Sequence, residues 1–132
     1  MSSSSEEALD ALKAHYSRWQ LGDWTDGSIF DPFAVGVFPD PTPHPQYGIE
    51  AMSDYMRRFL EGWKSIRVEA GTFRAIGDTF LVEAHLIGTG RESGLSMQDR
   101  VFHAWTFRGG KAIRVEFFSR ESDALEAVGL SE

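Results

Sequence analysis

The residue best suited to do chemistry in this sequence is a histidine that interrupts an apolar row. Val101, His103, Trp105 and Phe107 stand at alternate positions, so a strand through this segment projects all four side chains to one face. An imidazole titrates near neutral pH, which makes His103 a candidate general acid or base. The alternative is a core histidine, held by a tyrosine hydroxyl or a backbone carbonyl.

A carboxylate and a second imidazole stand close together in the most distinctive loop, Pro39 to Gly48, which holds four prolines in ten residues. Asp40 and His44 can share a proton there, and Tyr47 follows three residues later. Proline fixes φ, so we expect a stiff loop that forms one wall of a pocket mouth. The favoured alternative for Asp40 is turn chemistry, which aspartate beside proline promotes without catalysis.

The sequence offers little to a metal or a cofactor. It contains no cysteine, and its four histidines lack a paired ligand spacing such as His-x-His. The glycine-rich stretch from Gly88 to Gly94 precedes no helix, so it is interpreted as a hairpin turn and not as a phosphate-binding loop. We therefore expect no metal site and no cofactor.

Composition excludes several classes of partner. The chain has 132 residues, 42% of them hydrophobic, which fits one domain spanning 1–132 with a flexible N-terminus of about four residues. A net charge of −7 argues against nucleic acid and against anionic membranes. No apolar run is long enough to span a bilayer, and the serine-rich, acidic start does not look like a signal peptide. The expected location is cytoplasmic.

The pattern of apolar residues predicts an α+β fold. A first helix is expected from near Ser4 to Gly22, followed by a strand over 34–38. A second helix should place Ile49, Met52, Met56, Phe59 and Trp63 on its inner face. Four strands then form a meander, from about Ile66 onward, with a hairpin at Gly109-Gly110, and a short helix ends at Val128-Gly129-Leu130.

The second face of the predicted sheet also carries apolar residues. Alternation along the strands sends outward Leu81, Ile87, Phe102, Ala104 and Phe118. A monomer rarely exposes so much apolar surface in one patch. We therefore predict a homodimer through this outer sheet face, which Phe102→Glu would disrupt.

The order of these elements, with a short helix after the first, resembles the SnoaL-like branch of the nuclear transport factor 2-like superfamily. The matching pieces are Gly22-Asp23-Trp24, Tyr47-Gly48, the run from Trp105 to Lys111, and the segment from Ala124 to Leu130. The resemblance covers nearly the whole chain. It implies a cone-shaped, cystatin-like roll, in which a curved, mostly antiparallel sheet wraps around the N-terminal and central helices.

The same resemblance implies a small-molecule pocket inside the cone. The family includes ketosteroid isomerases, polyketide cyclases, limonene epoxide hydrolase and non-enzymatic binding modules. The polar catalytic residues of the hydrolase and the isomerase fall near Ala84, Leu86, Phe117 and Phe38, all apolar here, so these two activities are disfavoured. The side chains expected to contact a small hydrophobic ligand are Tyr16, Trp19, Phe38, Tyr47, Phe59, Trp63, Ala84, Trp105 and Phe117.

Two functions remain open. One is a non-catalytic small-molecule-binding domain with a mostly apolar pocket. The other is an enzyme of isomerase, cyclase or lyase type, which uses His103 and Asp40 to transfer protons on a small hydrophobic substrate. The apolar inward face favours the first.

Overall fold

Three helices and a six-stranded sheet form the part of the chain that the computed structural model describes, residues 2–24, 26–39 and 44–130. The helices are α1 (Ser2–Gln20), α2 (Ile49–Glu61) and α3 (Glu121–Ala127). The strands are β1 (Phe30–Phe38), β2 (His44–Tyr47), β3 (Trp63–Ile76), β4 (Thr79–Gly90), β5 (Ser96–Arg108) and β6 (Lys111–Phe118). They lie in the order β2-β1-β6-β5-β4-β3, and only β1 and β6 are parallel neighbours. The predicted α+β class with a mostly antiparallel sheet is confirmed.

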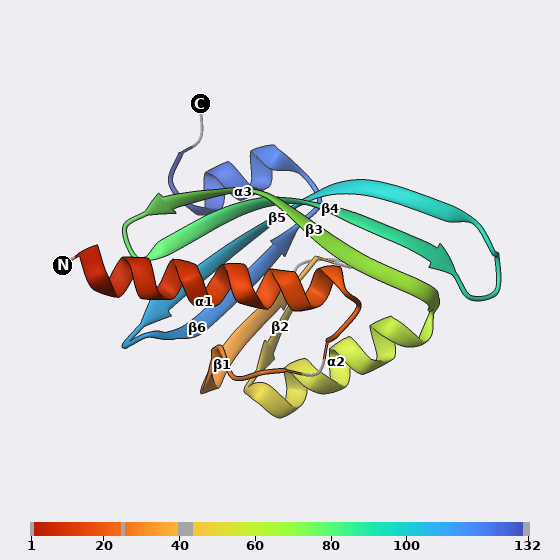
Figure 1. Cartoon of the computed structure of the whole chain (residues 1–132), viewed down its shortest axis with the longest axis horizontal. Coiled ribbons are helices and arrows are strands. Elements are labelled where there is room, and N and C mark those ends of the chain that lie inside the picture. The colour runs from red at the N-terminus through yellow and green to blue at the C-terminus, as the bar shows by residue number, and fades with distance from the viewer. Residues whose placement is uncertain (1, 25, 40–43, 131–132) are drawn as a thin grey trace.

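Helix α1 lies across the inner face of the curved sheet (Figure 1). Its apolar residues recur at helical spacing, so Leu12, Tyr16 and Trp19 all point to the sheet and are buried there. They pack in one cluster with Val82 of β4 and Trp105 of β5, and both of these side chains are fully buried. This cluster fixes the position of α1 relative to the meander β3–β6.

Helix α2 covers the inner side of β1. A side chain at Gly36 would approach the Met52 sulfur within 3.0 Å, so glycine allows the close contact between helix and strand. Two residues further along β1, the Phe38 ring stacks on Tyr55 of α2 with ring centroids 3.9 Å apart. Together α1, α2 and the inner sheet face enclose the space in which the candidate site lies.

Several local predictions were wrong. The expected loop contains strand β2, which pairs with β1 from Val35–Tyr47 to Phe38–His44. Trp63 begins β3 instead of ending α2, because the helix stops at Glu61 before Gly62. The described residues between α1 and β1 form turns and no short helix.

A bulge in the pairing of β5 with β6 changes which residues of β6 face inward. The register shifts between Thr106 and Phe107, so that Phe107 pairs with Ala112 and Thr106 with Arg114. A bulge of one residue reverses the alternation beyond it. As a result Ala112 and Val115, which are three residues apart, both join the buried cluster of the inner face, whereas simple alternation along β6 would have placed Ile113 there with Val115.

The outer sheet face is covered by the protein's own C-terminal helix. Helix α3 lies on the opposite side of the sheet from α1 (Figure 1), and its Ala124 packs against Leu81 and Phe102. Phe102 retains only 3% exposure. The end of the helix is fixed as predicted, because the Leu130 amide donates to the Leu125 carbonyl at 2.8 Å.

This packing corrects the argument for the dimer. Leu81, Phe102 and Ala104 are buried within one chain, so they do not form the exposed patch that the alternation indicated. Phe102→Glu would bury a charge under α3, and loss of the fold would then mask any effect on association. The homodimer stays a prediction, and the large apolar side chains that the described strands expose are Phe33 of β1 and Tyr47 of β2, outside the region that α3 covers.

None of the helices in the described segments combines the length and the apolar character that crossing a membrane requires.

Candidate functional site

A small cavity opens between the inner sheet face, α2 and the end of α1. We call it the His103 cavity; its volume is about 290 Å³, near the lower end of the range for small-molecule sites. Its apolar wall consists of Trp19, Trp24, Phe38, Pro39, Tyr55, Met56, Phe59, Trp63, Val68, Leu86, Met97, Val101, Phe117 and Phe118. The lining also includes three side chains that are more polar than this wall, those of Asp99, His103 and Ser119. The site is therefore an aromatic pocket with few polar groups.

His103 is held in the wall by a chain of hydrogen bonds. The Tyr16 hydroxyl oxygen lies 2.8 Å from Trp105 Nε1 and 2.5 Å from His103 Nδ1. An indole N–H can only donate, so the hydroxyl oxygen accepts from Trp105. Among the described residues, His103 Nδ1 is the one acceptor within hydrogen-bond distance of the Tyr16 hydroxyl, so we assign the hydroxyl proton to this bond. Nδ1 is then an acceptor, and the ring proton of a neutral His103 resides on Nε2.

Burial keeps this histidine neutral. His103 is 4% exposed, and desolvation lowers its pKa from 6.5 to about 3. Desolvation also raises the pKa of the Tyr16 phenol well above 10, although the Trp105 hydrogen bond opposes the shift. At neutral pH the ring thus has no free lone pair to take a substrate proton. What it can offer to the cavity is an Nε2–H donor.

Asp99 is the carboxylate nearest to His103 along the same strand face. Both residues line the cavity from β5, but they are four residues apart, which corresponds to roughly 13 Å along a strand. Asp99 itself is exposed. The two groups therefore flank the cavity at a distance and do not form a hydrogen-bonded acid–base pair.

The site residues predicted from the sequence lie in different places in the structure. Those that line the His103 cavity are Trp19, Phe38, Phe59, Trp63, Phe117 and His103 itself. Tyr16, Ala84 and Trp105 lie behind the wall in the buried cluster. Tyr47 is 71% exposed on β2, away from the cavity. Asp40 lies outside the described residues.

Sequence reasoning missed part of the lining. Trp24 lies in an irregular segment without periodicity, but the centroid of its ring lies 5.0 Å from that of the Trp19 ring. Met56 was assigned to the inner face of α2 without being named as a ligand contact. Met97 and Asp99 share the alternation of His103, so extending that row by two positions toward the N-terminus would have found both.

A second, larger cavity adjoins the first and shares several wall residues with it. This His15 cavity has a volume of about 710 Å³ and lies between the end of α1, the segment before β1, and α2. His15 of α1, at 2% exposure, contributes to its lining. Burial, assisted by the nearby Arg18 charge and opposed by Asp26, lowers the pKa of His15 to about 4.

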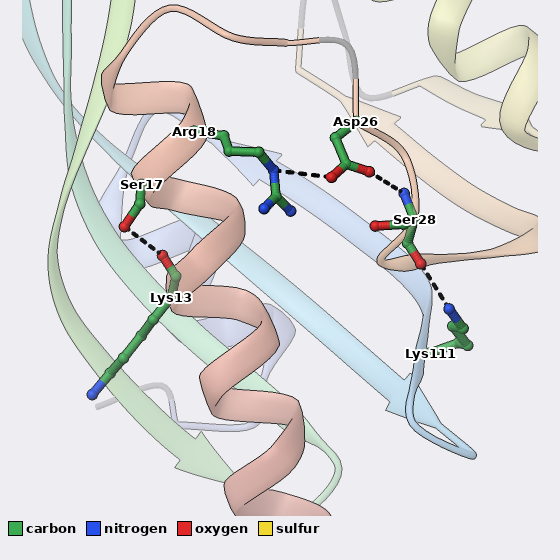
Figure 2. Close-up of polar contacts among 6 residues, drawn as sticks. All are labelled: Lys13, Ser17, Arg18, Asp26, Ser28 and Lys111. Atoms are coloured by element: carbon green, nitrogen blue, oxygen red, sulfur yellow. Dashed lines mark hydrogen bonds and ion pairs between the residues drawn. The ribbon is translucent and has the colours of Figure 1, made fainter.

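An ion pair fastens one side of the His15 cavity. Arg18 Nε lies 3.1 Å from the Asp26 carboxylate, which also accepts the Ser28 amide at 2.8 Å (Figure 2). The Ser28 hydrogen bonds and, to a smaller extent, the Arg18 charge lower the pKa of Asp26. Lys111 at the β5–β6 hairpin donates to the Ser28 carbonyl at 2.8 Å. These contacts tie the segment before β1 to α1 and to the sheet.

No group of three or more histidine, aspartate or glutamate side chains within the described residues is arranged to hold a metal ion.

Comparisons with known proteins agree with this architecture. The family model of the SnoaL-like domain matches residues 12–115. No functionally curated protein matches the chain.

Three solved structures illustrate the fold. A nuclear transport factor 2-like protein of unknown function from Burkholderia pseudomallei K96243 is 16% identical and has a TM-score of 0.77 over 92% of this chain and 97% of its own. A protein of ketosteroid isomerase-like fold from Catenulispora acidiphila DSM 44928, in complex with trimethylamine, is 18% identical with a TM-score of 0.71 over 90% and 92%. TerC, co-crystallised with polyporic acid, is 19% identical with a TM-score of 0.72 over 93% and 98%.

At these identities the structural likeness establishes the fold and no activity. The family match spans more than half of the sequence and includes the second half of α1, all of α2 and most of the sheet. The chain therefore belongs to the SnoaL-like domain family.

Proposed function

We propose that the protein binds a small, neutral, mostly apolar molecule in the His103 cavity and holds it by a hydrogen bond from His103 Nε2–H. The single observation that carries this proposal is the Trp105–Tyr16–His103 chain, which occupies Nδ1 and leaves Nε2 as a donor. A carbonyl oxygen is the matching group on the ligand. The aromatic wall suits a flat, apolar body.

Electrostatics supports a binding role over acid–base catalysis by histidine. A general base needs a lone pair and a pKa near the working pH. His103 has its Nδ1 lone pair engaged and its pKa lowered to about 3. Both features suit a fixed donor in a dry pocket, because a neutral ring loses little hydration when a ligand covers it.

Replacing His103 by phenylalanine is expected to weaken the binding of acetophenone fivefold to tenfold, because one hydrogen bond to the ketone is worth roughly 1 kcal/mol. Ethylbenzene, which lacks the carbonyl, should bind the variant and the parent protein equally. Isothermal titration of both probes measures the difference. His85→Phe is the matched control, since His85 is exposed on the opposite face of β4 and should leave both affinities unchanged. Equal loss for the two probes would refute the proposed hydrogen bond.

The alternative function is an enzyme, and the observation in its favour is the Asp99 carboxylate in the same cavity. Its distance from His103 along β5 suits abstraction of a proton remote from a carbonyl that His103 holds. The probe 3-methylcyclohex-2-enone, which carries acidic hydrogens both next to and remote from its carbonyl, tests this in D2O. Binding alone predicts the same deuterium uptake with the parent protein and with Asp99→Asn. Faster uptake that is lost in Asp99→Asn would favour the enzyme.

A further inference from the structure

His15 is the least satisfied polar side chain in the described core. It lies on α1 among the rings of Trp19, Phe30 and Trp105, and neither Nδ1 nor Nε2 has a hydrogen-bond partner. Each buried polar group without a partner costs roughly 1–3 kcal/mol. A phenylalanine or leucine would fill the same place without that cost. A histidine here therefore points to a partner that the protein alone does not supply.

The adjoining cavity is large enough to hold such a partner. His15 contributes to the lining of the His15 cavity, whose volume of about 710 Å³ lies well within the range of small-molecule sites. Around it the wall is mostly aromatic and aliphatic, with Trp24, Phe30, Met52 and Met56 among its members, and the charged side chains that also line the cavity are Asp26, Arg57, Glu61 and Arg91. This wall favours a flat apolar body over water alone.

Charge at the His15 end of the cavity favours a neutral ligand. The two nearest charged groups, Arg18 and Asp26, pair with each other at 3.1 Å, so neither is left to attract an ion. The lowered pKa of His15 keeps its ring uncharged at neutral pH. A neutral imidazole offers one donor and one acceptor, and a hydroxyl group can use either.

We propose that the His15 cavity is a second small-molecule site, in which His15 hydrogen-bonds a neutral aromatic ligand that carries a hydroxyl group. The site is distinct from the His103 cavity, although the two share Trp19, Trp24, Phe38, Met56 and Phe117 as walls. It does not depend on the function proposed for His103. Its preferred ligand differs, because a hydroxyl group can use either the donor or the acceptor of His15, whereas a ketone can use only the donor.

The test uses 2-naphthol and naphthalene as a matched pair of probes, in the His103→Phe background so that the other cavity lacks its donor. NMR on protein with nitrogen-15 in the histidine rings follows His15 directly. Binding of 2-naphthol should shift the His15 ring nitrogens, whereas naphthalene should not. A further change, His15→Phe, should weaken 2-naphthol about tenfold, as expected for roughly 1.4 kcal/mol, and leave naphthalene unchanged.

Two results would overturn the proposal. One is a saturating amount of 2-naphthol that leaves the His15 nitrogens unshifted. The other is a His15→Phe variant with unaltered 2-naphthol affinity and a raised melting temperature, which would assign His15 to the core alone. The NMR arm needs no change at His15, so it remains decisive if His15→Phe does not fold. Persistence of the His15 shifts while acetophenone binding at His103 fails would separate this proposal from the first.

Discussion

Acidification from pH 7 to pH 5 is expected to lower the free energy of unfolding by about 4 kcal/mol, because two histidines are buried as neutral rings. The pKa of His103 falls to about 3 and that of His15 to about 4, from 6.5 in each case. At a pH between the folded pKa of each histidine and its ordinary value of 6.5, the unfolded chain binds more protons than the folded one. The stabilisation is therefore complete above pH 6.5 and is lost as the pH falls below that value.

The pH window separates histidines from carboxylates. Asp26 and Glu83 also have lowered pKa values in the folded protein, but their ordinary values are 3.8 and 4.5, so their contribution is lost mainly below pH 5. Urea unfolding at pH 7, 6 and 5 measures the loss. His15→Phe and His103→Phe should each remove about half of the pH dependence, and the exposed control His85→Gln should remove little. Stability that stays constant between pH 7 and pH 5 would contradict the burial of neutral rings.

Tyr16→Phe is expected to lower the free energy of unfolding by about 2–4 kcal/mol, although it removes a single oxygen atom. The substitution leaves Trp105 Nε1–H and His103 Nδ1 without their shared partner. Each loss costs roughly 1–3 kcal/mol in a buried position. Tyr47→Phe is the control, because Tyr47 is 71% exposed and its change should stay within about 0.5 kcal/mol.

A double-mutant cycle distinguishes the hydrogen-bond chain from simple packing. If Tyr16→Phe and Trp105→Phe act through the same bond, their combined cost should be smaller than the sum of the single costs. Denaturant unfolding of the four proteins gives the coupling. Strict additivity, or a Tyr16→Phe variant as stable as the parent, would show that the hydroxyl does not organise this part of the core.

Regular elements with strong periodicity could be predicted from the sequence, and elements decided by tertiary contacts could not. The meander from β3 to β6 follows from alternation and from turn signals such as Gly109-Gly110. Strand β2 was missed because a segment rich in proline has low strand propensity. It forms at the sheet edge, where a proline such as Pro45 is tolerated because one side of the strand needs no hydrogen bonds.

The outer sheet face shows why alternation alone can mislead. It correctly placed Leu81 and Phe102 away from α1, but it could not say what covers them. The covering element is α3, a helix of seven residues whose packing depends on tertiary structure. Local sequence therefore predicted the apolar surface but not that the chain's own helix covers Leu81 and Phe102.

At the candidate site, the sequence predicted which strand face carries His103 but not which side chain forms a hydrogen bond with it. Alternation placed His103 beside Trp105 on one strand face, but the bond to Tyr16 joins residues that are 87 positions apart. Such contacts depend on the angle at which α1 crosses the sheet. The same reason hid His15, which on the helix looked like one more residue between Leu12 and Trp19.

The tautomer of His103 tests the central claim most directly, because the proposed function depends on an Nε2–H donor facing the cavity. Nitrogen-15 NMR of the histidine rings, recorded from pH 4 to pH 8, reports both the tautomer and the charge. The hydrogen bond from Tyr16 predicts a proton on Nε2, an unprotonated Nδ1, and no titration of His103 above pH 5. A proton on Nδ1, or a titration midpoint near 6.5, would contradict the account.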